Sequence, residues 1–428
     1  MKQKSKQSDI MNVLLNPSSI TAKNLENKKN LNHINNSNTL NSIFSLNEIH
    51  DENYMHNIDY IIKDDGKYLI IDYVQLYKSI SYLSEIIRPW CSIKTGRGVS
   101  IRIINNISAE LIFYDSTYYF KTTLPAKNTF DVGDMLFMDY HFLTKMKKKL
   151  PKSILIYTTD INEKDNCKYY IRLNIGDLQL YDCYLTSELQ EIITKYYKPT
   201  TLLGSIEINE LHKKIGTMCG LLEFEQDIKY KKINIYNGKM QFKQPLIFAK
   251  IKINLPNMII DYKTARFLVK FCEKNKHGEI KIYLIDSKVP RYAIVYENTI
   301  FITNYTESKY IDVQTLLDDL ETVPVDYSKL YHQLDSLTSI TYSKGRITLE
   351  NKNNSLMCTS NLVNSDLEIR IKTLGKITIP ENEKYVTQHI SLLHILKYLN
   401  PKIELRIGFK DYILYLVSSD IVIGIVCV

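Results

Sequence analysis

Residues capable of catalysis or metal binding do not fall at the spacings that those chemistries need. The nine histidines form no HExxH pair, and His389 and His394 are five positions apart, which places them on different faces of a helix. The short Gly96-Arg97-Gly98 sequence lacks the Gly-Lys-Ser/Thr ending of a phosphate-binding loop, and no Gly-x-Ser-x-Gly elbow occurs. We therefore expect no enzyme, cofactor or metal ion, although a site assembled from distant residues would leave no such motif.

Cysteine usage and hydropathy indicate the cellular compartment. The seven cysteines are widely spaced, odd in number and without a CxxC pair, so we expect reduced, mostly buried thiols more than disulfides or a zinc site. No run of about 18 apolar residues is available to span a bilayer, and the first residues lack the apolar core of a secretory signal. The chain is expected to be soluble and cytoplasmic.

Basic residues, in contrast, are concentrated on one repeated element, where they could bind phosphates. Three expected helices at 139–150, 261–273 and 389–399, with the residues that follow them, carry net charges of +4, +3 and +2, against +8 for the whole chain. The alternative is that these lysines only keep exposed helices soluble, but their repetition favours a surface that faces a phosphate backbone. No recognition helix, zinc finger or aromatic groove accompanies them, so base-specific reading is not indicated. The candidate DNA-binding residues are Lys145, Lys148, Lys149, Arg266, Lys270, Lys274 and Lys397.

The elements that must position these residues form a threefold repeat. A first helix is expected at 72–87, 207–221 and 326–337, and each basic second helix follows it after a run of short strands. The centres of the second helices, Thr144, Phe267 and Ile395, are 123 and 128 residues apart. Because most strands follow one another directly, antiparallel meanders are favoured over a doubly wound fold. The fold class is therefore α+β, with two helices packed on antiparallel sheets in each of three domains, at 66–190, 200–320 and 324–428.

Residues 1–65 differ from the rest in composition. Eleven asparagines lie in the first fifty positions, and no arginine precedes Arg88. Such a polar segment cannot bury enough apolar surface to fold alone, so we expect a disordered, solvated tail rich in Asn, Ser and Lys. An organelle transit peptide is the alternative, although those peptides are usually rich in arginine.

The pattern resembles the bacterial β sliding clamp, the processivity subunit of DNA polymerase III, over about residues 68–428. The first helix reads YLIIDYVQLYKSISYLSEII, the stretch GVSIRIINNISAELIFYDSTYYFKTTLPAKN is similar to the first strand meander of that family, and ILKYLNPKIELRIGFKDYILYLVSSDIVIGIVCV resembles its closing helix and strands. The resemblance implies a clamp-fold ring that encircles duplex DNA and tethers a polymerase. Two other readings are a clamp-fold scaffold for transcription or repair proteins and a basic β-rich structural protein.

The ring of that family has two three-domain chains and twelve helices around its hole. With helix axes about 10 Å apart and a helix radius of about 5–6 Å, twelve helices leave a hole of about 27 Å, which admits a duplex roughly 20 Å across. Diffuse attraction between lysines and phosphates would centre the duplex without fixing a register. Ring closure is expected from edge strands at about 169–183 and 340–358 of a homodimer.

The resemblance also implies a pocket for short peptides of the polymerase and the clamp loader, at the junction of the second and third domains. Two departures from the family pattern fall there: Lys243–Phe248 stands where a Thr-Asp-Gly-His-Arg-Leu run is usual, and the chain ends Gly424–Val428 in place of a Met-Pro-Met-Arg-Leu-like tail. The detailed contacts are therefore expected to differ. Carried over by position, the pocket residues are Leu246, Phe248, Val313, Leu316, Val422 and Val426.

Overall fold

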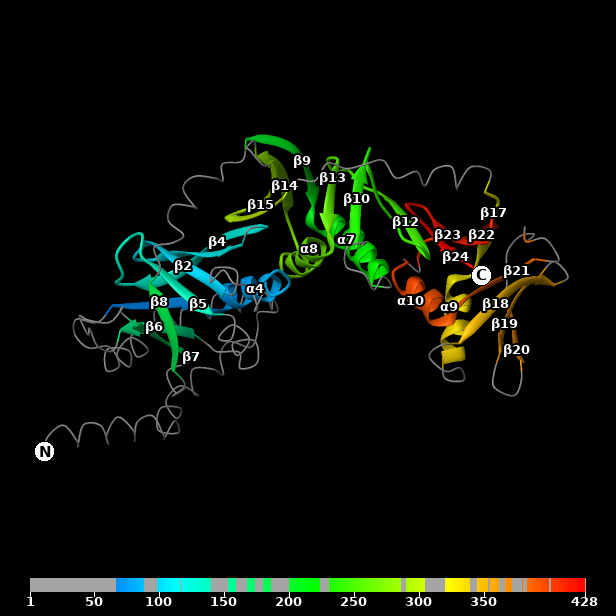
Figure 1. Cartoon of the computed structure of the whole chain (residues 1–428), viewed down its shortest axis with the longest axis horizontal. Coiled ribbons are helices and arrows are strands. Elements are labelled where there is room, and N and C mark those ends of the chain that lie inside the picture. Colours follow the sequence, from blue (N-terminus) through cyan, green and yellow to red (C-terminus); the bar gives the residue numbers. More distant parts are fainter. Residues whose placement is uncertain are drawn as a thin grey trace, which may run out of the picture. The chain divides into compact units, whose positions relative to one another are not determined.

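The computed structural model divides the chain into two compact units. The first comprises residues 1–197 with 297–301, and the second comprises residues 198–296 with 302–428. The ranges that the structure describes are 67–87, 98–115, 117–139, 153–158, 168–173, 180–185, 200–223, 231–285, 290–304, 320–338, 345–352, 355–361, 366–371, 379, 383–399 and 402–427. Figure 1 shows the helices and strands of both units, coloured along the sequence.

Each third of the described chain has eight strands and a first helix, and a second helix is described in the last two thirds. The first third contains β1 (Tyr68–Asp72), α4 (Tyr73–Leu83), β2 (Gly98–Asn105), β3 (Ser108–Tyr114), β4 (Tyr118–Asn128), β5 (Met135–Asp139), β6 (Ser153–Thr158), β7 (Lys168–Leu173) and β8 (Leu180–Leu185). The second contains β9 (Thr201–Glu207), α7 (Ile208–Leu222), β10 (Lys232–Tyr236), β11 (Lys239–Lys243), β12 (Ile247–Lys252), β13 (Met258–Asp261), α8 (Tyr262–Lys274), β14 (Glu279–Ile285), β15 (Arg291–Tyr296) and β16 (Thr299–Asn304). The last contains β17 (Thr322–Val325), α9 (Tyr327–Thr338), β18 (Arg346–Lys352), β19 (Ser355–Asn361), β20 (Asp366–Ile371), β21 (Lys384–Gln388), α10 (His389–Lys397), β22 (Leu405–Lys410), β23 (Ile413–Ser418) and β24 (Ile421–Val426).

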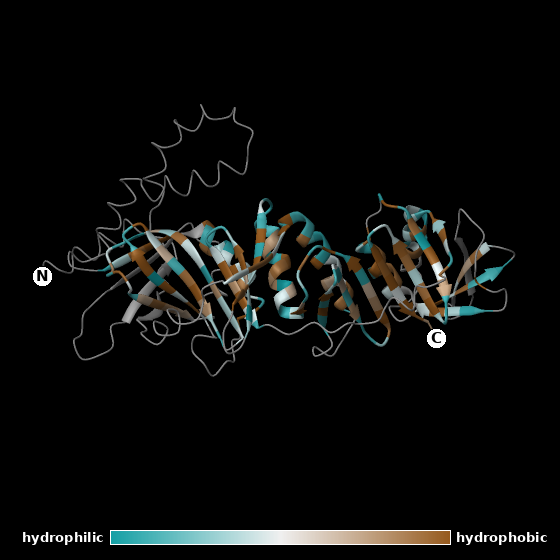
Figure 2. Ribbon diagram, turned by 90° about the horizontal axis from the view of Figure 1, so that it is seen from above, coloured by the Kyte–Doolittle hydropathy of each residue, from teal (hydrophilic) through white to brown (hydrophobic). Residues whose placement is uncertain are grey.

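In the first unit the eight strands pair in a closed circuit. The order is β1-β6-β7-β8-β5-β2-β3-β4, and β1 pairs with both β6 and β4. Alternation along the strands sends Leu69, Ile101 and Leu111 into the core, where none of their side chains is exposed. Figure 2 shows the same alternation as brown and teal bands along the strands. Closing the circuit leaves few unpaired edges in this unit.

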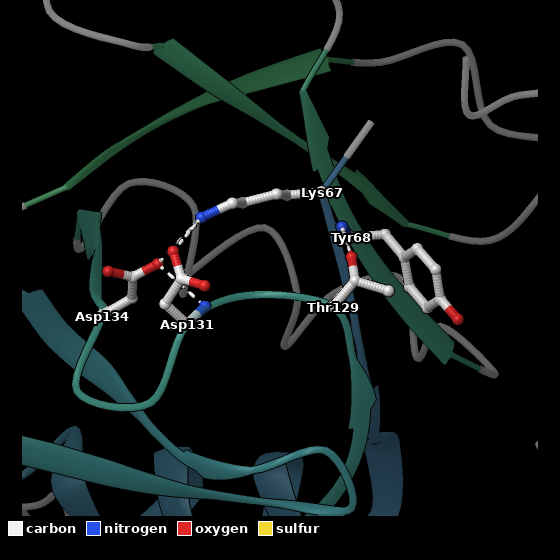
Figure 3. A network of polar contacts seen from close by, with 5 residues as sticks. All are labelled: Lys67, Tyr68, Thr129, Asp131 and Asp134. Atoms are coloured by element: carbon white, nitrogen blue, oxygen red, sulfur yellow. Dashed lines mark hydrogen bonds and ion pairs between the residues drawn. The ribbon is translucent and has the colours of Figure 1, made fainter. Parts of the chain in front are cut away.

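A polar network fixes the start of β1 against the turn after β4 (Figure 3). The backbone of Tyr68 donates to Thr129 Oγ1 at 2.9 Å, and the backbone N–H of Thr129 donates back to the Tyr68 carbonyl at 3.0 Å. The Lys67 ammonium donates to the Asp131 carboxylate and lies 3.7 Å from Asp134. The hydrogen bond to Asp131 raises the pKa of Lys67, so the lysine stays charged where it bridges the turn.

The second unit joins strands from two repeats in one sheet. Its order is β13-β10-β11-β12-β24-β23-β22-β17, and β12 pairs with β24 from Ile247 opposite Ile425 to Ile251 opposite Ile421. A second sheet, β20-β19-β18-β21, belongs to the last repeat. Strands β9, β14, β15 and β16 follow one another in a third set of pairings. The β12–β24 pairing therefore connects elements almost 180 residues apart into one surface.

Three helices of the second unit, α7, α8 and α9, begin directly after an acidic residue. Asp261 accepts hydrogen bonds from the Thr264 backbone and hydroxyl at 3.0 and 2.7 Å and so caps α8, and Asp326 accepts from the Lys329 backbone at 3.0 Å to cap α9. Glu207 precedes α7 without a side-chain cap; the Gly278 carbonyl instead accepts from the Ile208 backbone at 3.0 Å. These caps fix the points at which the chain turns from sheet to helix.

The structure agrees with most expected elements and corrects some of them. The three first helices and the second helices at 261–273 and 389–399 are present as α4, α7, α9, α8 and α10. At Asp139, where a helix was expected to begin, strand β5 ends, and the rest of that expected helix lies outside the described residues. The strands that precede the helices, such as β1, β9 and β17, were not expected from the sequence.

The prediction of which strand edges close a ring was wrong in part. Strand β7 has β6 and β8 as neighbours, and β18 and β19 are likewise paired on both sides. In the part of the chain that the structure describes, β20 pairs only with β19, and Leu180–Cys183 of β8 pairs only with β7. The four-stranded sheet of the last repeat therefore ends at β20 on one side and at β21 on the other, not at β18 or β19, because the order of strands in the sheet decides which strand is outermost.

Two further expectations concern cysteines and membranes. The cysteines whose side chains the structure describes, Cys219, Cys272, Cys358 and Cys427, are free and buried, which confirms the expectation of reduced thiols for these four. Burial raises the pKa of Cys272 and of Cys358 to about 12, so both stay protonated at neutral pH. Among the helices of the described residues, none combines the length and the hydropathy that a membrane-spanning helix requires.

Candidate nucleic-acid and partner surfaces

Helices α7 and α8 lie side by side in the second unit (Figure 1). The inner side of α8 is apolar: Ala265, Phe267, Leu268, Phe271 and Cys272 are buried at helical spacing. Phe267 and Phe271 stack with their ring centroids 6.0 Å apart. This packing fixes the rotation of α8, and the basic residues between the apolar ones must then point away from the core.

The outer sides of the two helices enclose a shallow hollow of about 480 Å³. Four basic side chains and two carboxylates line it, so positive charge predominates, as a surface for phosphates requires. Lys397 and Tyr398, from the end of α10, complete the rim. The basic side chains are Lys213, Arg266, Lys270 and Lys397, and the carboxylates are Glu223 and Glu273.

Glu223 orders the centre of this hollow. Its two carboxylate oxygens lie 3.9 Å from Arg266 Nη1 and 3.9 Å from His394 Nε2. Arg266 is also within 3.5 Å of the Tyr262 hydroxyl, and its guanidinium carbon lies 5.8 Å from the centre of that ring. Burial raises the pKa of Tyr262, which therefore remains a neutral phenol beside the arginine. Arg266 is thus held in a defined position in the hollow.

A glycine allows the third repeat to approach this surface. A Cβ added at Gly220 of α7 would lie 2.1 Å from the ring of Tyr398, so only glycine admits the ring at that point. The ring of Tyr398 also meets His394 edge-on with centroids 5.1 Å apart. The end of α10 is therefore packed against α7, and this contact places Lys397 on the same hollow as Arg266.

The predicted DNA-binding residues are only partly gathered by the structure. Arg266, Lys270 and Lys397 line the one hollow, and Lys274 is exposed in the last turn of α8. The others, Lys145, Lys148 and Lys149, lie outside the described residues. Sequence reasoning missed His394 and Glu223, because nothing in the sequence shows that residues 171 positions apart would meet.

A second surface lies on the face of the β12–β24 sheet that is opposite to α7 and α8. Phe248 and Tyr415 form an apolar cluster there, with ring centroids 5.8 Å apart at an interplanar angle of 67°. Burial raises the pKa of Tyr415 to about 12. Partly exposed apolar side chains surround these two rings, so the cluster reaches the surface; they are Leu320, Ile413, Val417 and Val422.

The predicted pocket residues are distributed around this cluster. Phe248 and Val422 belong to it. Leu246 is 62% exposed at the neighbouring turn, and its carbonyl accepts from the Val426 backbone at 2.9 Å. Val313 and Leu316 lie outside the described residues. The structure thus places four of the six residues along one face of the β12–β24 pairing, and Leu246 is accessible to a partner.

Comparison with known structures gives the fold a name. The chain is similar to the DNA polymerase sliding clamp of Bacillus subtilis, with a TM-score of 0.65 at 14% identity, over 85% of this chain and 99% of that one. The chain has the sliding-clamp fold. Similar values hold for the sliding clamp of Bartonella birtlesii bound to griselimycin, with a TM-score of 0.66, 13% identity and the same two coverages.

A third sliding-clamp structure is similar to this chain to the same extent. The DNA polymerase III subunit beta of Borrelia burgdorferi, in complex with a natural product, has a TM-score of 0.64 at 14% identity, over 84% of this chain and 98% of that one. No family model and no curated protein matches the sequence. Coverage of nearly the whole of each sliding clamp means that the threefold repeat of strands and helices corresponds to the complete fold.

Proposed function

We propose that this protein is a DNA sliding clamp, a ring that encircles duplex DNA and tethers the replicative polymerase as a processivity factor. The observation that carries the proposal is the sliding-clamp fold itself, which spans 85% of this chain and 99% of the Bacillus subtilis clamp. Each repeat forms one domain, and the chain acts by enclosure and not by catalysis. It works in the cytoplasm, at the site of replication.

The hollow over α7 and α8 supports contact with DNA. Lysines at Lys270, Lys274 and Lys397 present flexible ammonium groups, and Arg266 adds a positioned guanidinium. None of these groups reads a base in this role; they attract phosphates of any sequence, which lets a duplex slide. The equivalent part of the first repeat supplies Lys145, Lys148 and Lys149.

The apolar cluster around Phe248 and Tyr415 supports docking of partner peptides. Its exposed neighbour, Leu246, offers an anchoring point, and Val422 and Val426 continue the apolar surface along β24. Short segments of the polymerase and the clamp loader would bury their own apolar side chains here. The pocket includes Val313 and Leu316.

Ring closure requires a second copy of the chain. Strand β20 has an unpaired edge among the described residues, as does Leu180–Cys183 of β8, and such edges readily add a strand from another chain. We expect β20 of one copy to pair with β8 of the other in a two-fold dimer.

Sedimentation of the purified full chain tests this assembly. The proposal predicts twice the mass of the 50.0 kDa chain at micromolar concentration. A chain that remains a monomer throughout that range would contradict a two-chain ring, whereas a trimer would keep the enclosure but change its stoichiometry.

A further inference from the structure

One face of strands β10, β11 and β12 carries only positive charge. The charged residues of these three strands are all lysines, and alternation places each of them on the face that also bears Phe248; they are Lys232, Lys239, Lys243, Lys250 and Lys252. The other face, with Met240 and Ile251, is buried against the helices. These lysines therefore lie on the opposite side of the sheet from the basic hollow of α7 and α8, and a duplex in that hollow does not account for them.

Two of these lysines form a like-charge pair. Lys239 of β11 is directly opposite Lys252 of β12 in the strand register, and both side chains are exposed. Like charges in directly opposed positions destabilise a pair of strands. In the part of the chain that the structure describes, neither lysine has a carboxylate within ion-pair distance. An anionic ligand would therefore relieve a repulsion that the fold itself leaves in place.

The like-charge pair lines a cleft of about 560 Å³ at the end of the β12–β24 pairing. The turn between β10 and β11 and the turn between β23 and β24 form two of its walls, and α7 forms a third. Two carboxylates line it as well: Glu210 is 2.6 Å from Lys214, and Asp420 lies in the β23–β24 turn. The lining has four lysines against these two carboxylates, so its net charge is positive.

The cleft and the apolar cluster of Phe248 and Tyr415 form one continuous surface. Val422 lines the cleft and packs against the cluster. On the same face of β12, Lys252 is four residues from Phe248, or about 13 Å along the strand. Lys243 of β11 is directly opposite Phe248, so positive charge also begins beside the cluster. A segment that spans this surface in an extended conformation needs an apolar side chain at the cluster and a carboxylate about four residues away.

We propose that the partner segment that docks at the apolar cluster is acidic on one side of its apolar anchor, and that its carboxylates occupy the cleft beside Lys239 and Lys252. The docking itself rests on the proposed function, to which this inference adds the charge of the partner. A phosphate backbone would complement the lysines equally well, but it has no apolar group for Phe248 and Tyr415. An acidic segment with an apolar anchor complements both parts of the surface.

Two fluorescein-labelled peptides test the proposal by fluorescence anisotropy with the full chain. The first, Ser-Gly-Leu-Phe-Glu-Gly-Glu-Glu-Gly-Ser, places glutamates one, three and four residues after the phenylalanine, and the second has glutamine in place of each glutamate. We expect the acidic peptide to bind about three- to tenfold more tightly at low salt, because at least two exposed charge pairs form. Raising the salt concentration should remove most of this difference.

The double variant Lys239→Gln, Lys252→Gln should remove the preference for the acidic peptide. Its affinity for that peptide should fall about three- to tenfold, while its affinity for the glutamine peptide stays the same. The variant should also unfold at a higher urea concentration, since the like-charge pair is gone, so a loss of affinity does not come from misfolding. The matched control, Lys276→Gln with Lys281→Gln, removes two exposed lysines outside the cleft and should leave both affinities unchanged.

Three results would overturn the proposal: equal affinity for the two peptides, a loss of the same size for both peptides in the Lys239→Gln, Lys252→Gln chain, or no binding of either peptide. A lower affinity of that variant for duplex DNA, with its peptide preference intact, would also overturn it, since the cleft would then be a phosphate site. Retention on circular DNA, measured separately, tests the ring and does not depend on the cleft. Failure of this proposal and failure of the proposed function are therefore distinguishable.

Discussion

Gly424 of β24 lies directly opposite Phe248 of β12, and a Cβ added at Gly424 would come within 2.0 Å of the phenyl ring. The ring fills the space that a side chain would occupy and packs edge-on against Tyr415. This pair holds two repeats in one sheet and forms the floor of the apolar cluster.

Gly424→Ala should destabilise the second unit by about 1–3 kcal/mol, because the ring of Phe248 must move out of a packed position. Urea unfolding measures the change. Gly216→Ala is the matched control: it lies inside α7 with nothing within 4 Å of the added Cβ, and it should stabilise the helix by about 0.5–1 kcal/mol. Equal effects of the two substitutions would contradict the packing described here.

Gly220→Ala should separate α10 from α7, because the added methyl group collides with the ring of Tyr398. We expect a loss of about 1–3 kcal/mol in the free energy of unfolding. Combining it with Tyr398→Ala should cost less than the sum of the two single changes, since the collision partner is gone. Additive effects in this double-mutant cycle would show that the two residues are not in contact.

Neutralising the basic side chains of the hollow should weaken DNA binding and should make that binding less dependent on salt concentration. In Lys270→Gln, Lys274→Gln, Lys397→Gln, the slope of log K against log salt concentration should fall by about 0.9 for each lysine that meets a phosphate. Filter binding over a range of salt concentrations measures it. An unchanged slope would remove this surface from the DNA interface, and all duplex sequences should be affected alike.

Glu350 should make the free energy of unfolding depend on pH in the acid range. Lys352 at 3.0 Å, with Lys384 at 3.3 Å, holds the pKa of this carboxyl below its ordinary value of 4.5. The carboxylate therefore stabilises the fold fully above that value, and the contribution is lost as the pH falls through the lowered pKa. Glu350→Gln should cost a few tenths to about 1 kcal/mol at pH 7. Thermal unfolding at several pH values should show this difference shrinking below pH 4.5, and a constant difference would contradict it.

The helices and the repeat could be predicted from the sequence because their signals are local. Apolar residues at helical spacing, from Ala265 to Cys272, define α8 without any tertiary information. The strand β17 is four residues long and leads almost directly into α9, so its alternation is too short to separate from the helix pattern. The sequence therefore predicts long periodic elements well and short leading strands poorly.

The sites were less predictable because they depend on strand register and on distant contacts. Lys250 and Lys252 alternate visibly in the sequence, but only the pairing of β11 with β12 brings Lys239 opposite Lys252. Phe248 and Val422, taken from the family resemblance, do meet in one cluster. Tyr415, the largest partner of Phe248, was missed because no local pattern distinguishes it from the other tyrosines of the chain.

Retention on covalently closed circular DNA tests the sliding-clamp proposal most directly. The protein, loaded onto circular duplex with a clamp loader, should stay bound through a wash in high salt, because enclosure does not depend on the charge contacts that salt screens. Cutting the circle once should then release it from the ends. Retention after linearisation, with release by salt from circular and linear DNA alike, would mean ordinary phosphate binding and would contradict a ring that encloses the duplex.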